Sequence, residues 1–200
     1  MTNEINRIGR ACRMTSETNV EVKVNLDGEK QNSNIDTSSG FFNHMLKLFA
    51  YHAGFNLEVL GSGDTEIDDH HLVEDVGLVM GQAFKKALGD KSGINRYADI
   101  HLPMDEALVL VVTDISGRPH LTYDVYFQTE RVGSFELPLI EEFLKSFVNE
   151  AKITLHVRKI LGKDSHHIAE AIFKGLGRCL NDATTFNGEK YVIPSTKGTL

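Results

Sequence analysis

Hydrophobic and polar residues alternate along the chain with two different periods. From residue 20 to 26 every second residue is apolar, which predicts a strand with one buried face. From residue 41 to 53 the apolar positions recur at helical spacing, and Gly54 follows as a helix stop. The apolar run at 107–112 predicts a buried strand. The chain therefore mixes strands and helices.

A second helix is predicted over residues 70–88, because its apolar positions also recur at helical spacing. A strand at 56–60 and a glycine-rich turn at 61–64 precede it. Either Asp68 or Asp69 is expected to cap its first turn, because aspartate side chains accept hydrogen bonds from free backbone N–H groups there.

The same pattern occurs twice in the chain. The motif His-His-x-x-Glu stands at 70–74 and again at 166–170, an offset of 96 (166 minus 70). The helix and strand before each motif align at an offset of 98 (142 minus 44), so the second copy is two residues shorter before its histidines. Each half reads strand, strand, helix, strand, helix. We predict an α+β fold of two similar halves, 1–93 and 94–200, each a β-sheet with helices packed on one face.

The two motifs carry side chains that ligate metal ions. His70 and Glu74 share a helix face because they are four residues apart, whereas His71 points about 100° away. Each motif therefore offers a His/Glu pair to one ion and a single His to another. Pseudo-symmetry then predicts two ligand sets: His70, Glu74 and His167 for one ion, and His166, Glu170 and His71 for the other.

One further ligand is available to each ion. His44 precedes the first motif by a helix and a strand, and Glu142 occupies the corresponding place in the second half. Imidazole and carboxylate ligands without a thiolate favour Mn, Fe, Co or Zn over Cu(I) or an iron–sulfur cluster. The spacing also differs from the His-Glu-x-x-His motif of zinc peptidases.

Composition narrows the class of protein. The 200-residue chain carries a net charge of −7, which argues against general binding of nucleic acid or anionic membranes. No apolar run approaches the roughly 18 residues that a membrane span needs. The first ten residues are polar, so no secretory signal is expected. Cys12 and Cys179 are isolated, which favours the reducing cytoplasm over a disulfide scaffold.

Several short motifs, in their order and spacing, resemble the imidazoleglycerol-phosphate dehydratase family. The resemblance runs from about residue 10 to 198. The motifs stand at 15–18, 40–46, 68–75, 95–97, 104–107, 116–119, 166–171 and 194–198. Family members often carry His at the position of Glu142, and some carry a polar residue at that of Leu48. A carboxylate at 142 remains a competent ligand for a hard metal ion.

The resemblance implies a fold, a reaction and an assembly. The fold is of the ribosomal-protein-S5 domain 2-like type. The reaction is the dehydration of imidazole glycerol phosphate to imidazole acetol phosphate in histidine biosynthesis, in the cytoplasm. Two Mn²⁺ ions per active site are implied, at interfaces between subunits of a 24-mer built from trimers.

That reaction removes a carbon-bound proton beside the imidazole, which is not acidic in water. Two metal ions, one on each ring nitrogen, would stabilise the imidazolate and so accept the charge. Glu17 and Glu170 are the candidate acid/base groups. Asp105 and Glu106 are expected to orient groups around the metals.

The phosphorylated substrate needs cations in an acidic chain. Arg96, Arg118 and Lys197 are the candidates, with Ser195 and Thr196 beside Lys197 in a C-terminal tail that ligand would order. The residues of the first motif are also expected to contact substrate: His70, His71, Leu72, Val73 and Glu74.

Two other functions compete with a metal-dependent lyase. A dinuclear metal phosphohydrolase also combines His/carboxylate sites with cationic side chains, but it is expected to use metal-bridging Asp residues. A non-enzymatic metal-binding protein would need neither Glu17 nor the cations Arg96, Arg118 and Lys197.

Overall fold

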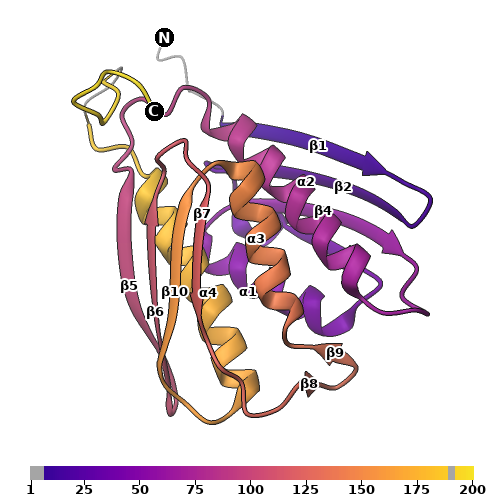
Figure 1. Ribbon diagram of the computed structural model, residues 1–200. Coiled ribbons are helices and arrows are strands. Elements are labelled where there is room, and N and C mark those ends of the chain that lie inside the picture. Colours follow the sequence, from indigo (N-terminus) through magenta and orange to yellow (C-terminus); the bar gives the residue numbers. More distant parts are fainter. Residues whose placement is uncertain (1–6, 189–191) are drawn as a thin grey trace.

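Two four-stranded sheets of identical topology flank the helices of the computed structural model (Figure 1). The structure describes residues 7–188 and 192–200, so most of the polar N-terminal segment lies outside it. The elements of the first half are β1 (Ile8–Met14), β2 (Thr18–Asn25), a 3-10 turn (Lys30–Asn32), β3 (Asn34–Thr37), α1 (Gly40–Ala53), β4 (Asn56–Gly63) and α2 (His70–Leu88). Those of the second half are β5 (Tyr97–Met104), β6 (Ala107–Asp114), β7 (His120–Asp124), β8 (Arg131–Val132), β9 (Phe135–Glu136), α3 (Leu139–Ala151), β10 (Thr154–Leu161) and α4 (Ser165–Thr184).

The strand orders repeat from half to half. The first sheet runs β1-β2-β4-β3 and the second β5-β6-β10-β7. In each sheet the first three strands pair antiparallel, and the fourth pairs parallel with its neighbour. The prediction of an α+β fold with two similar halves, each a sheet with helices on one face, is confirmed. Gly93, the expected seam, lies in the connection between α2 and β5.

The helices of the two halves interleave between the sheets. Helix α2 packs on β1 and β2, and α4 packs on β5 and β6. Across the middle, α2 contacts α3 of the other half, and α4 contacts α1 (Figure 1). One continuous cluster of buried apolar side chains therefore runs through both halves. This arrangement brings side chains on α1 beside side chains on α4, although they are far apart in sequence.

Two equivalent glycines allow the helices to approach so closely. Gly81 of α2 and Gly177 of α4 differ by the repeat offset of 96. A Cβ at Gly81 would lie 2.5 Å from the backbone oxygen of Phe147 on α3. A Cβ at Gly177 would lie 2.6 Å from the backbone oxygen of Phe49 on α1. Each helix pair therefore depends on a position without a side chain.

We expect Gly81→Ala to destabilise the fold by about 1–3 kcal/mol, because a backbone atom that blocks a new methyl group cannot move without shifting α3. Thermal unfolding measures the effect. Gly40→Ala at the start of α1 is the matched control, because a Cβ there meets nothing within 4 Å. Equal unfolding midpoints for Gly81→Ala and the wild type would contradict this account of helix packing.

The sequence patterns missed β3 in the first half and β7, with the two-residue strands β8 and β9, in the second, and they ended β4 too early. Strands β3 and β7 are short and polar, and in β3 only Ile35 is a buried apolar residue. They join the sheets by backbone pairing, which leaves little trace in side-chain periodicity. Strand β4 continues to Gly63, through most of the predicted turn at 61–64. Among the described residues, no helix is both long enough and apolar enough to cross a membrane.

Candidate metal centre and active site

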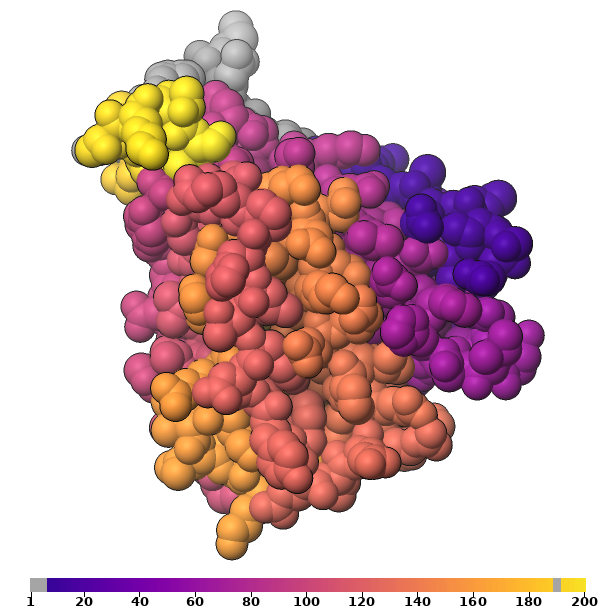
Figure 2. All heavy atoms as spheres, viewed as in Figure 1, coloured from indigo at the N-terminus to yellow at the C-terminus, as the bar shows by residue number. Residues whose placement is uncertain are grey.

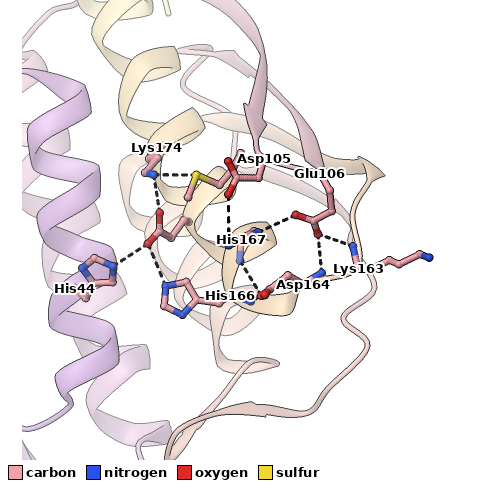
Figure 3. A network of polar contacts seen from close by, with 10 residues as sticks. His44, Asp105, Glu106, Lys163, Asp164, His166, His167 and Lys174 are labelled. Carbon is pink, nitrogen blue, oxygen red and sulfur yellow. Dashed lines mark hydrogen bonds and ion pairs between the residues drawn. The ribbon is translucent and has the colours of Figure 1, made fainter.

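Helices α1 and α4 bring three metal-ligating side chains together: His44, His166 and Glu170 (Figure 3). One carboxylate oxygen of Glu170 lies 2.9 Å from Nε2 of His44 and 3.1 Å from Nε2 of His166. One ligand atom from each side chain lies within 4.8 Å of the others. Two imidazole nitrogens and a carboxylate oxygen that converge in this way suit one divalent cation.

Glu170 is held as an anion in a mostly buried position. Burial by itself would raise the pKa of this carboxyl, but hydrogen bonds with Lys174, His44 and His166 lower the pKa to about 2. Nζ of Lys174 lies 2.6 Å from the second oxygen of Glu170 and 3.3 Å from Sδ of Met104. Lys174 was not among the predicted site residues, although its place four residues after Glu170 on a helix was visible in the sequence.

The neighbouring His167 faces a different carboxylate. Its Nδ1 lies 2.8 Å from Glu106, in the turn between β5 and β6 (Figure 3). The hydrogen bond with His167, together with backbone N–H donors of Asp164 and Lys163, lowers the pKa of Glu106 to about 2. Asp105 is mostly exposed and stands 3.8 Å from Nε2 of His167. Both residues that were expected to orient metal ligands therefore lie against His167.

The first motif has a corresponding arrangement at the start of α2. His70 and Glu74 point along one helix face, with Nε2 3.8 Å from the carboxylate. Nδ1 of His71 lies 3.0 Å from Asp64 and 3.9 Å from Glu17. The hydrogen bond with Asp64 raises the pKa of His71. Asp64 had been assigned only to a turn, so sequence reasoning missed this contact.

Other residues singled out in the sequence make contacts of a different kind. Glu142 on α3 forms an ion pair with Lys145, at 3.2 Å. The side chains of Leu72 and Val73 are fully buried in the core, so only their backbone is available to a substrate. Leu48 packs against the edge of the same core.

Aspartates cap the starts of both motif-bearing helices, as expected for α2. In the first half Asp69 occupies the cap position, and the side chain of Asp68 accepts the backbone N–H of His70 at 2.8 Å. In the second half Asp164 accepts the backbone N–H groups of His166 and His167. These bonds fix the first turns on which the histidines stand.

The predicted phosphate-binding cations gather around the end of β6. The guanidinium of Arg96 donates to both oxygens of Asp114, at 2.7 and 3.3 Å, and to the carbonyl of Pro194 in the tail. Arg118 is exposed and lies 3.9 Å from Asp114. The tail residues Ser195, Thr196 and Lys197 follow directly after Pro194.

This cationic group and the metal-ligand cluster stand at opposite ends of α4. His166 stands in the first turn of the helix, whereas the backbone N–H of Arg96 donates to the carbonyl of Ala183 near its end. Twenty helical residues span about 30 Å. Figures 1 and 2 show the tail, in yellow, at the end of the molecule away from the start of α4. One chain therefore does not bring both sets of residues to one small molecule.

Comparison with known proteins assigns this arrangement to a family. The family model described as imidazoleglycerol-phosphate dehydratase matches residues 37–180, which include both motifs and His44. The chain belongs to the imidazoleglycerol-phosphate dehydratase family. The resemblance inferred from the sequence is thereby confirmed.

Individual family members match over nearly their whole length. An imidazoleglycerol-phosphate dehydratase of Caldicellulosiruptor saccharolyticus is 52% identical over 97% of this chain and 98% of its own. One from Methylobacterium radiotolerans is 52% identical over 97% of this chain and 100% of its own. The solved imidazoleglycerol-phosphate dehydratase of Staphylococcus aureus has a TM-score of 0.82 and 39% identity, covering 90% of this chain and 99% of its own. Fold and family therefore agree.

Proposed function

We propose that this chain catalyses the metal-dependent dehydration of imidazole glycerol phosphate to imidazole acetol phosphate in histidine biosynthesis. The activity is that of a carbon–oxygen lyase. The observation that carries the proposal is the convergence of His44, His166 and Glu170 on one point, in a family member whose first motif carries the same ligand types at His70 and Glu74.

The ligand types suit two hard or borderline divalent cations. One ion would take His44, His166 and Glu170, and the other would take His70 and Glu74, with Glu142 as a further ligand. The single histidines, His71 and His167, would complete the sites of the opposite motif from another copy of the chain. We propose that both ions are Mn²⁺. When bound, they would act as Lewis acids toward the imidazole ring of the substrate.

Glu17 is the better placed of the two candidates for proton transfer. Its carboxylate is 54% exposed and stands 3.9 Å from Nδ1 of His71, beside the ligands without being one of them. Glu170 is engaged by three partners and has a pKa of about 2, so it is a weak base at neutral pH. We therefore assign Glu17 to proton transfer and Glu170 to metal binding.

The phosphate group would be held by a different copy of the chain. Arg96, Arg118 and Lys197 lie about one helix length from the start of α4, so an interface between copies is needed to bring them to the metal ions. Ser195 and Thr196 would add hydrogen bonds from the tail. We propose that this assembly is a 24-mer of trimers with active sites at subunit interfaces, working in the cytoplasm.

Turnover of the proposed substrate tests the function. Purified protein loaded with Mn²⁺ is incubated with imidazole glycerol phosphate, and the ketone product is measured. Removal of the metal with a chelator should lower the rate at least about 100-fold, and Mn²⁺ should restore it, because Lewis acidity contributes several kcal/mol. Release of inorganic phosphate would instead indicate a phosphohydrolase, and stoichiometric metal without turnover would indicate a storage protein.

A further inference from the structure

The two halves hold their single histidines with carboxylates from different places in the fold. In the second half the carboxylate is Glu106, which stands directly before β6. The equivalent residue of the first half is Glu17, directly before β2. If the halves were functionally identical, Glu17 would hold His71 as Glu106 holds His167.

The first half uses Asp64 instead. Its carboxylate lies 3.0 Å from Nδ1 of His71, whereas that of Glu17 lies 3.9 Å away. Asp64 is also the less exposed of the two, with 16% of its side chain accessible against 54% for Glu17. The backbone N–H of Asp64 donates to the carbonyl of Glu17, at 3.1 Å, which fixes the loop after β4 beside the start of β2.

The second half has no carboxylate at the equivalent position. The register shift in β10 between Lys159 and Leu161 adds one residue to the repeat offset of 98, so the position of Asp64 corresponds to Lys163 (64 plus 99). The residue before it is glycine in both halves: a Cβ at Gly63 would meet Leu72 and Thr18, and a Cβ at Gly162 would meet Ile168 and Ala107. The shorter loop runs against β6, where Glu106 accepts the backbone N–H groups of Lys163 and Asp164 at 2.9 and 2.7 Å. The carboxylate of Glu106 is therefore occupied by two backbone N–H groups and His167.

We propose that Asp64 is the positioning residue of His71, and that by taking this part it leaves Glu17 free to move protons. A carboxylate that accepts Nδ1–H fixes the tautomer and the ring orientation, and so presents Nε2 to a metal ion. The equivalent residue of the second half is Lys163, so only the first half carries a second carboxylate beside its single histidine. The inference rests on the proposed function, and it explains why only one of two equivalent glutamates remains available for chemistry.

Binding of Mn²⁺ tests the assignment without relying on turnover. The free Mn²⁺ remaining in a titration is read from its electron paramagnetic resonance signal. Asp64→Ala and Glu106→Gln should each weaken Mn²⁺ binding about 10- to 100-fold at one class of site. Glu17→Gln should leave Mn²⁺ binding unchanged. Glu66→Gln is the matched control, because it removes an exposed carboxylate from the same loop as Asp64.

A conservative variant separates positioning from general damage to the loop. The amide oxygen of Asp64→Asn can still accept Nδ1–H of His71, so this variant should recover part of the affinity that Asp64→Ala loses. The thermal unfolding of each variant is compared with that of Glu66→Gln. If Asp64→Ala unfolds at a clearly lower temperature than Glu66→Gln, the test of positioning rests on Asp64→Asn instead. We then expect Asp64→Asn to bind Mn²⁺ slightly less tightly than the wild type, at one class of site.

Two results would overturn the assignment. One is wild-type Mn²⁺ affinity in Asp64→Ala. The other is a loss of affinity in Glu17→Gln as large as that in Glu106→Gln, because Glu17 would then be the residue that holds His71. If the wild type binds Mn²⁺ but does not dehydrate imidazole glycerol phosphate, the proposed function fails while the binding series still decides the part played by Asp64.

Discussion

Replacing Glu17 with glutamine lowers kcat by about 10²- to 10⁴-fold, the range expected when a general acid or base is removed. The KM for imidazole glycerol phosphate and the bound Mn²⁺ change little, because Glu17 stands beside the ligands and Asp64 holds His71. Steady-state kinetics and metal analysis of the purified variant measure both. Glu21→Gln is the matched control, because Glu21 is exposed on β2, the strand that begins directly after Glu17.

The alternative base is Glu170. If Glu170 alone moved the proton, Glu17→Gln would retain nearly wild-type kcat. Glu170→Gln cannot make this distinction by itself, because the same carboxylate oxygen faces both His44 and His166, and its removal should empty the metal site as well. A variant that loses kcat and keeps its metal identifies the residue that moves protons.

Co-expression of two inactive chains restores activity if each active site uses metal ligands from one copy and cations from another. Arg118→Ala removes an exposed cation, and His166→Ala removes a ligand at the far end of α4. Each variant alone should have little activity. In a randomly mixed symmetric oligomer about one quarter of the sites would combine an intact ligand cluster with an intact cation, so about one quarter of wild-type activity is expected.

In the control pair, both substitutions fall in the same cluster of metal-ligand candidates, His44, His166 and Glu170. His166→Ala and Glu170→Ala remove ligands that belong to the same three-residue group of one chain, so no mixture of these two chains contains an intact cluster. Their co-expression should stay inactive. If the Arg118→Ala and His166→Ala pair also stays inactive although both chains assemble together, the proposed division of the site between copies is wrong.

The sequence by itself determined the local structure and the duplication. Helix α2 begins and ends at the predicted residues, 70 and 88, because apolar periodicity and glycine stops act within a few turns of the chain. The repeated His-His-x-x-Glu motif predicted the side chains that could ligate a metal ion, because side chains four residues apart share a helix face whatever surrounds the helix. The resemblance to the family rested on the same short motifs.

Only the tertiary structure decided which of these side chains meet. His44 lies beside Glu170, 126 residues later in the chain, because α1 packs against α4 of the other half. Local periodicity reports which side of a helix is buried but not which helix covers it. For the same reason Asp64 could be read only as a turn residue, until the loop after β4 placed it 3.0 Å from His71. The separation of Arg96 from the metal ligands likewise follows from the length and direction of α4, which composition and charge do not encode.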